Sequence, residues 1–188
     1  MKGALVVLGI VVLAALIGGS YLFGVRNDLV REQNDIQGKW AQVDNDLKRR
    51  ADLIPNLVET VKGFAKQEQT VFGAIAEARS RLLNSHSPQE SINANNQLSG
   101  ALGRLLVLQE NYPQLKSNEQ FLRLQDELAG TENRIAISRR DYNDAITKYN
   151  TDIELFPRSL AASLFGFHRN DAYFKTTEEE KKVPNVKF

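Results

Sequence analysis

The chain has 188 residues, enough for one folded domain beside a membrane anchor. Its 24 Lys and Arg residues nearly balance 23 Asp and Glu residues, which argues against a nucleic-acid partner, because phosphate binding needs surplus cations. The absence of cysteine excludes disulfides, thiolate metal sites and cysteine nucleophiles. Charged residues, Leu and Ala are abundant and proline is scarce, which favours an all-α fold.

An uncharged apolar segment opens the chain, running from Gly3 to Val25 between Lys2 and Arg26. A helix of about 20 residues crosses the hydrocarbon core of a bilayer, so we expect residues 1–25 to form a transmembrane anchor. A cleaved signal peptide is the alternative, but its apolar core is shorter and is followed by a small-residue cleavage site. We therefore expect a retained anchor and a single-pass protein whose main partner is the lipid bilayer.

Charges flanking the anchor give two answers about the side on which the domain lies. More Lys and Arg residues follow the anchor than precede it, which favours a cytoplasmic domain. The acidic residues among them make the net charge favour the opposite side. We follow the positive-residue count and expect the cytoplasmic side, with the other side left open.

Small residues within the anchor are spaced so that they share a helix face. Ala14 and Gly18 form one small-xxx-small pair, and Ala15 and Gly19 form a second, overlapping pair. Such pairs let helix backbones approach closely in lipid, so these four residues are candidates for self-association. Ordinary anchor composition is the alternative, because Gly and Ala are common in membrane helices.

Apolar residues after the anchor recur at steps of three and four, which predicts one long helix over Arg26–Ser85. Pro55 lies inside this pattern and should kink the helix, because an interior proline deletes a backbone hydrogen bond. The apolar stripe stays in phase across Pro55, which favours one bent helix over two.

Turn and cap signals divide the rest of the chain. Ser87, Pro88 and Glu90 form a capping box that opens a second helix to about Glu110, and Ser117 with Gln120 forms a second capping box. Further elements are a third long helix over Asn118–Leu155, a short helix over Pro157–Phe165 that ends before Gly166, and a charged, irregular tail. The resulting domains are a 1–25 anchor, a 26–169 elongated bundle and a partly disordered 170–188 tail.

Helix lengths suggest that the part of the long helix nearest the membrane lacks a partner. At about 1.5 Å per residue, the second and third helices would not reach back along a first helix of roughly 90 Å. That part still carries an apolar stripe of Ile36, Trp40, Val43 and Leu47. Exposed stripes of this kind mark interfaces, so either other copies of the chain or the C-terminal tail should cover it.

Two further clusters are candidate sites. The first surrounds the proline and consists of Arg49, Arg50, Asp52, Pro55 and Asn56; it is either an inter-subunit contact or structure that supports the kink.

The second cluster is the aromatic segment near the C-terminus, which comprises Phe156, Phe165, Phe167, Tyr173 and Phe174. Basic residues are interleaved with these rings, as at a membrane interface. The alternative is that the segment packs on the long helix.

Several motifs together resemble the LemA family of bacterial membrane proteins. They are Trp40-Ala-Gln-Val43, Leu47-Lys-Arg-Arg-Ala-Asp-Leu-Ile-Pro-Asn-Leu-Val58, Tyr112-Pro113-Gln-Leu-Lys116, Arg139-Arg-Asp-Tyr-Asn143, Phe156-Pro157, Gly166-Phe167 and Tyr173-Phe174. The resemblance covers nearly the whole chain and implies a membrane anchor, a helical bundle and location in a bacterial inner membrane. It brings no established reaction, cofactor or catalytic residue.

Nothing in the sequence indicates chemistry. No nucleotide-binding glycine loop, metallohydrolase motif or serine elbow is present, and neither His86 nor His168 has a partner at metal-ligand spacing. We therefore expect no catalytic residue, cofactor or metal. The first functional hypothesis is a homo-oligomeric scaffold that organises or shapes the bilayer. The alternative is a monomeric membrane-tethered adaptor that presents a helical groove to a protein partner.

Overall fold

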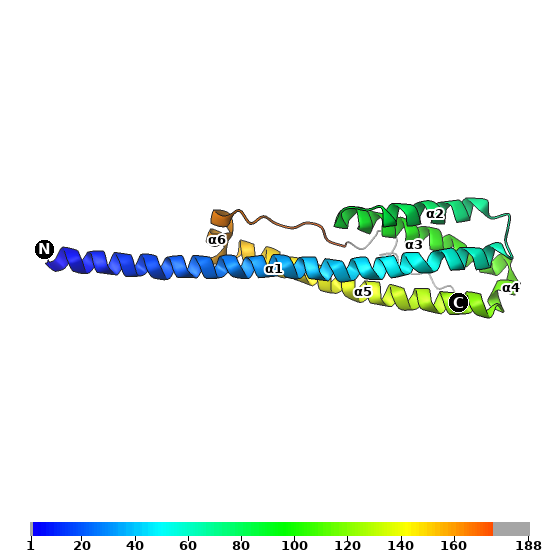
Figure 1. The fold of residues 1–188 in the computed structure, drawn as a ribbon, viewed down its shortest axis with the longest axis horizontal. Helices are drawn as coiled ribbons and strands as arrows, with labels where there is room; N and C mark the ends of the chain where they lie inside the picture. Colours follow the sequence, from blue (N-terminus) through cyan, green and yellow to red (C-terminus); the bar gives the residue numbers. More distant parts are fainter. Residues whose placement is uncertain (1, 175–188) are drawn as a thin grey trace, which may run out of the picture. The chain divides into compact units, whose positions relative to one another are not determined.

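The computed structural model describes residues 2–174, which form six α-helices and no strand (Figure 1). The helices are α1 (Lys2–Lys62), α2 (Gln69–Leu83), α3 (Pro88–Asn111), α4 (Pro113–Lys116), α5 (Glu119–Glu154) and α6 (Arg158–Phe165). The all-α fold expected from the sequence is confirmed. Among the described residues, unit 1 holds 2–39 with 144–171, and unit 2 holds 40–143 with 172–174.

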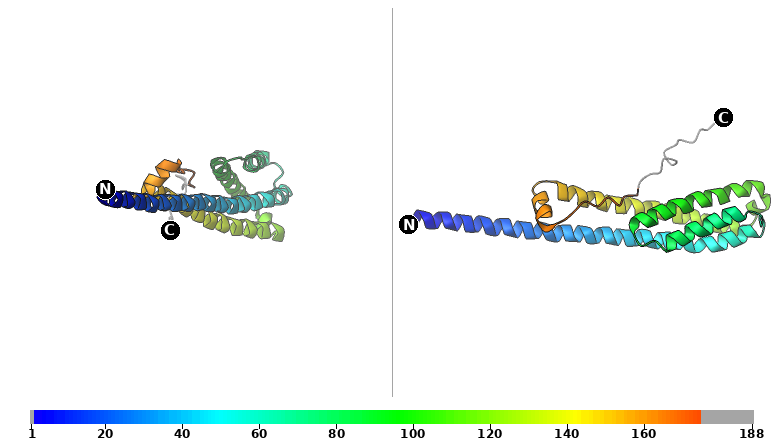
Figure 2. Two further views of the ribbon diagram at one scale, coloured as in Figure 1. Left: turned by 60° about the vertical axis from the view of Figure 1, so that its left-hand side comes forward. Right: turned by 90° about the horizontal axis from the view of Figure 1, so that it is seen from above.

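Unit 2 is a bundle in which successive helices reverse direction. The second part of α1, then α2, α3 and the first part of α5 run up and down beside one another (Figure 2). Their apolar faces meet in a core whose least exposed members include Ile54, Leu57, Ile75, Leu98, Leu105 and Phe121. Up-and-down connections by short turns are the usual topology of such bundles.

The first long helix is shorter than the sequence pattern predicts. A turn over residues 63–68 separates α1 from α2, so the expectation of one bent helix to Ser85 is wrong. The apolar spacing continues through this turn because Ala65, which is not helical, is nevertheless buried at 0% exposure. Glu68 is the residue that directly precedes α2.

Pro55 does not end α1, which remains helical on both sides of it and shows no break in the ribbon (Figure 1). Proline has no N–H to donate to the carbonyl of Ala51, four residues earlier. Arg79 of α2 fills that role, because its Nε donates to the Ala51 carbonyl at 2.8 Å. The helix is therefore continuous where a backbone bond is missing.

Two helix starts show which side chains cap them. Ser87 accepts a hydrogen bond from the Glu90 N–H at 3.3 Å, as predicted, although the Glu90 carboxylate accepts from the His86 N–H. The capping box expected at Ser117 is wrong. Asn118 caps α5 instead, its side-chain oxygen accepting from the Phe121 N–H at 2.8 Å.

Unit 1 pairs the first part of α1 with the last part of α5 and with α6 (Figure 1). Because α1 ends at Lys62, the 36-residue α5 reaches back far enough for Lys148 to pair with Glu32. The expectation that this part of α1 lacks a partner is therefore wrong.

The apolar stripe around Trp40, which was expected to lack a partner within the chain, is covered by other parts of the same chain. Ile36, Val43 and Leu47 are 6%, 0% and 1% exposed.

Candidate functional site

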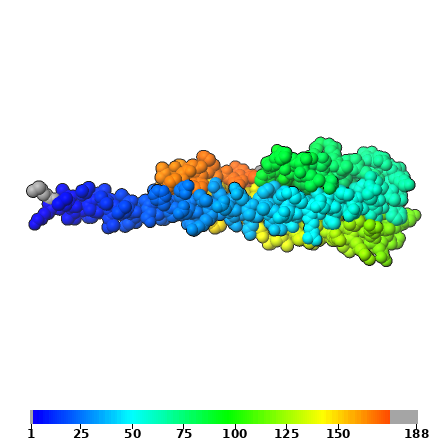
Figure 3. Space-filling model, viewed as in Figure 1, coloured from blue at the N-terminus to red at the C-terminus, as the bar shows by residue number. Residues whose placement is uncertain are grey.

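The apolar segment of α1 is the one helix among the described residues long and apolar enough to cross a membrane. Its most apolar 18-residue window has a mean hydropathy of 2.5, and none of that window is buried. Figure 3 shows the first part of α1 bare of other elements on the face in view. Such length and composition, with the apolar side chains left uncovered, are typical of a helix that spans a membrane.

The small residues of this segment are mostly exposed, with open space around the two glycines. Ala14, Ala15 and Gly18 are exposed, and Gly19 is half-buried. A Cβ atom added at either glycine would meet no atom within 4 Å. The self-association predicted for these residues stays a prediction.

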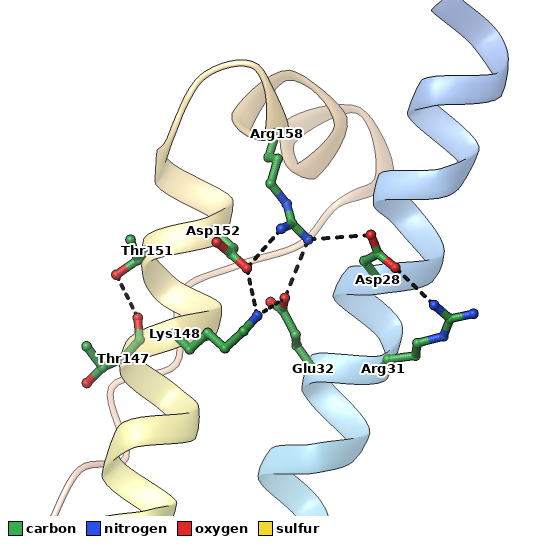
Figure 4. A network of polar contacts seen from close by, with 8 residues as sticks. All are labelled: Asp28, Arg31, Glu32, Thr147, Lys148, Thr151, Asp152 and Arg158. Carbon is green, nitrogen blue, oxygen red and sulfur yellow. Dashed lines mark hydrogen bonds and ion pairs between the residues drawn. The ribbon is translucent and has the colours of Figure 1, made fainter.

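Charged side chains from three elements meet where α1 passes α5 and α6. Arg158 of α6 lies 3.0 Å from Asp152 of α5 and 3.4 Å from Glu32 of α1, as Figure 4 shows. Lys148 also contacts both Glu32 and Asp152, at 2.9 Å from the latter. At the edge, Asp28 lies 4.0 Å from Arg158.

The two central carboxyls of this cluster, Glu32 and Asp152, have pKa values shifted in opposite directions. Burial, together with a hydrogen bond to Asp152, raises the pKa of the Glu32 carboxyl above its ordinary value. Burial acts in the same direction on Asp152, but hydrogen bonds from Glu32 and Lys148 and the charge of Arg158 outweigh it and lower the Asp152 pKa. Glu32 is therefore the carboxyl of the pair that binds a proton first as the pH falls.

The cluster fixes α6 against α1, and an aromatic contact fixes its other end. The ring of Phe165 lies 6.1 Å from the ring of Phe23, and the Arg26 guanidinium lies 5.9 Å from the Phe165 centroid. Ala161 and Ala162 are buried. Gly166, predicted to follow this helix, has a φ of 73°, a left-handed conformation that a residue without Cβ adopts at low cost.

Two of the C-terminal aromatic residues pack on the long helix, which is one of the two interpretations of the sequence; contact with lipid stays a prediction. Phe165 packs on α1 in unit 1, as does Phe174 in unit 2, through rings 6.1 Å from those of Phe23 and Trp40. Phe167 and Tyr173 are half-buried, whereas Phe156 is 80% exposed.

In unit 2, Trp40 lies in a cluster of three rings. Its ring is 5.3 Å from that of Tyr142, which in turn meets Phe174 edge-on at 6.0 Å. The Arg139 guanidinium lies 4.8 Å above the Phe174 ring. The C-terminal segment thus folds back on α1 at Trp40, so a second copy is not needed to cover this residue.

Two asparagines of α5 clasp this segment, a role that sequence reasoning did not assign. Asn143 donates to the Phe174 carbonyl at 2.9 Å and accepts from the Phe174 N–H at 3.0 Å. Asn150 makes the same pair of hydrogen bonds with Asn170, at 2.7 and 2.9 Å. The repeat of Tyr142-Asn143 as Tyr149-Asn150 is the signal in the sequence.

The cluster around the proline does not assemble as one site. Arg49, Asp52, Pro55 and Asn56 are exposed on α1, whereas Arg50 is 6% exposed.

The guanidinium of Arg50 is held by three partners in unit 2. Its Nη1 lies 3.0 Å from Asn95 Oδ1, 3.1 Å from Ser99 Oγ and 2.8 Å from the Glu132 carboxylate. Burial lowers the pKa of Arg50, and the charge of Glu132 opposes this shift. Arg50 therefore joins α1, α3 and α5.

A groove of about 360 Å³ opens beside Arg50 between these helices. Its walls are mainly apolar; they comprise Leu57, Leu102, Gly103, Leu106, Leu128 and Ala129, with Arg50, Ser99, Gln125 and Glu132 as polar members. Helix grooves of this composition accept apolar side chains from a partner. This groove is the candidate binding site of unit 2.

The described part of the chain holds no assembled metal site. No group of three or more His, Asp or Glu residues there is placed to hold a metal ion. The backbone N–H of His86 binds Glu90, and the carbonyl of His168 accepts from the Tyr149 hydroxyl at 3.0 Å. Both histidines thus contribute to local structure through their main chains.

Comparison with known proteins gives one family and two kinds of relative. The model of the LemA family matches residues 39–188. Protein LemA of Metamycoplasma hominis is 28% identical over 84% of this chain and 72% of its own length. Magnetosome protein MamQ 2 of Paramagnetospirillum magneticum is 27% identical over 79% of this chain and 64% of its own.

A third relative, magnetosome protein MamQ of Magnetospirillum gryphiswaldense, is 25% identical over 76% of this chain. The match spans 62% of that relative's own length. None of these names denotes an enzyme. With the apolar helix, these similarities indicate a membrane-associated protein.

Proposed function

The chain belongs to the LemA family, and from this membership and the geometry of unit 2 we propose that it is a non-enzymatic adaptor. In this proposal α1 crosses the bilayer once, and the helical bundle presents its groove to a protein partner. The observation that carries the proposal is the apolar groove between α1, α3 and α5.

The chemistry of the groove favours an amphipathic helix as the bound segment. Leu102, Leu106 and Leu128 offer apolar contacts, and Leu106 is 37% exposed, so part of the wall is accessible. An amphipathic helix places apolar anchors into such a groove at spacings of three and four residues. At one wall, the Arg50–Glu132 pair supplies charges that select the register of the partner.

Site-specific photocrosslinking in cells tests this function. A photoreactive phenylalanine replaces Leu106 in the groove wall or, as the matched control, the neighbouring Val107, which is 60% exposed and does not line the groove. We expect a discrete adduct with a different protein from position 106 and a much weaker one from position 107. The substitution Leu102→Glu, which places a charge in the wall, should abolish the adduct at 106.

Two results would contradict the adaptor. An adduct whose mass equals two copies of this chain would make the groove a self-association surface. Equal crosslinking at positions 106 and 107 would show that the groove confers no specificity.

A homo-oligomeric scaffold that shapes the bilayer remains the second candidate. Its support is the small-residue face of the anchor, where a Cβ atom added at Gly18 or Gly19 would meet no atom within 4 Å. The stripe of Ile36, Trp40, Val43 and Leu47 no longer supports it, because the chain covers these residues itself. A scaffold predicts that Gly18→Ile disrupts an oligomer in lipid, whereas Gly9→Ile, also in open space, does not.

The proposed location is a bacterial inner membrane with the bundle on the cytoplasmic side. The excess of positive residues after the anchor supports this orientation. Because the chain has no cysteine, Val107→Cys provides a unique label site. A membrane-impermeant maleimide should label it in inside-out vesicles and leave it unlabelled in intact spheroplasts; the reverse pattern would place the bundle outside.

A further inference from the structure

Unit 1 exposes a compact set of large apolar side chains on α6 and the turn that leads into it. Leu160 and Leu164, one helical turn apart, are 60% and 67% exposed. In the preceding turn, Leu155 is 57% exposed and Phe156 is 80% exposed. Four large apolar side chains gathered on so short a segment are unusual for a surface that faces only water.

This surface lies beside the point where the apolar segment of α1 ends. Phe165, next to Leu164, packs its ring 6.1 Å from Phe23, within the uncharged stretch of α1. Arg26, the first charged residue after that stretch, lies over the same ring at 5.9 Å. An anchor in a bilayer would therefore hold α6 at the level where lipid headgroups begin.

We propose that α6 lies in the lipid–water interface of the bilayer that α1 crosses. Leu155, Phe156, Leu160 and Leu164 insert between the headgroups, while Ala161 and Ala162 face the protein. The continuity of this surface with the membrane-spanning segment identifies lipid as the occupant. The proposal rests on α1 crossing the bilayer, and it is independent of what binds the groove in unit 2.

The charges around α6 favour apolar insertion over attraction to anionic lipid. Arg158 pairs with Glu32 and Asp152, and Arg169 pairs with Glu154 and Asp171. These cations are satisfied by carboxylates of the same unit. Insertion should therefore occur in a neutral phosphatidylcholine bilayer and should change little with ionic strength.

Nitroxide labelling of the full-length protein tests the proposal, because the natural chain contains no cysteine to remove. Leu160→Cys and Leu164→Cys report on the surface of α6. Leu13→Cys is the control within the apolar segment. Asn34→Cys, exposed on α1 about 13 Å beyond Val25 by helical rise, is the control for water. Each variant is labelled in phosphatidylcholine vesicles, and relaxation by oxygen and by a water-soluble nickel complex is measured.

Lipid insertion predicts that the labels at positions 160 and 164 collide more with oxygen and less with nickel than the label at 34. Both rates should lie between those at positions 13 and 34. High nickel rates at 160 and 164, equal to that at 34, would place α6 in water and overturn the proposal. Low rates with both reagents would mean that protein covers the surface, which would also overturn it. A high nickel rate at position 13 would instead refute the membrane span itself, so the two failures are distinguishable.

Discussion

Arg79 donates a hydrogen bond from its Nε to the backbone carbonyl of Ala51, at 2.8 Å, and so occupies the place that Pro55 leaves open. Ala51 is 0% exposed, so its carbonyl has no access to water as a substitute partner. A buried carbonyl without a hydrogen-bond donor destabilises the fold. The hydrogen bond from Arg79 of α2 therefore offsets the cost of having Pro55 inside α1.

The first prediction separates these two residues by a double-mutant cycle. Arg79→Met should destabilise the natural chain by about 1–2 kcal/mol, because it leaves the carbonyl unsatisfied. In a Pro55→Ala background, where an N–H is restored, the same change should cost clearly less. Denaturant unfolding in detergent measures both values. Additive effects would mean that Arg79 does not compensate for the proline.

Trp40 should belong to the fold of the single chain. Trp40→Ala should lower the free energy of unfolding by about 2 kcal/mol, less than the roughly 3–5 kcal/mol typical of a fully buried ring, because Trp40 is half-buried. Trp40→Phe should cost less, since it keeps a ring against Tyr142 and Phe174. Thermal unfolding and mass analysis of the same samples check this. A smaller assembly with unchanged stability would return Trp40 to an interface between copies.

Glu32 should make the stability of the protein depend on pH. Its pKa is raised in the folded state above the ordinary value of 4.5, so the folded state binds its proton first as the pH falls. The stability of the natural chain relative to Glu32→Gln should therefore rise as the pH falls from neutral toward that value, and fall as the pH rises. Melting temperatures of both proteins across this window provide the measurement. A constant difference would show that Glu32 titrates alike in both states.

The helices that sequence periodicity located well are those bounded by strong local signals. Ser87 and Pro88 mark the start of α3, and Gly166 marks the end of α6, because caps and glycine act within one turn. The turn after Lys62 was missed because its apolar residues keep helical spacing. One misplaced helix end then produced the wrong conclusion that the stripe around Trp40 was bare.

The candidate sites can be predicted from the sequence only in part. The anchor follows from composition alone, and the aromatic segment was recognised, although its two possible partners could not be separated. The groove could not be foreseen, because Leu57, Leu102 and Leu128 come from three helices whose register only packing determines. The role of Arg79 depends likewise on a contact between α2 and α1 that no local pattern encodes.

The mass of the full-length protein in phosphatidylcholine nanodiscs decides between an adaptor and a scaffold. The chain covers its own apolar stripe, so we expect one copy of 21.1 kDa per nanodisc when the lipid is in excess, at concentrations up to the physiological one. The same result should hold for Gly18→Ile, since in a monomer this residue faces only lipid. A uniform oligomer in the natural protein that Gly18→Ile dissociates would contradict the adaptor and establish self-assembly through α1.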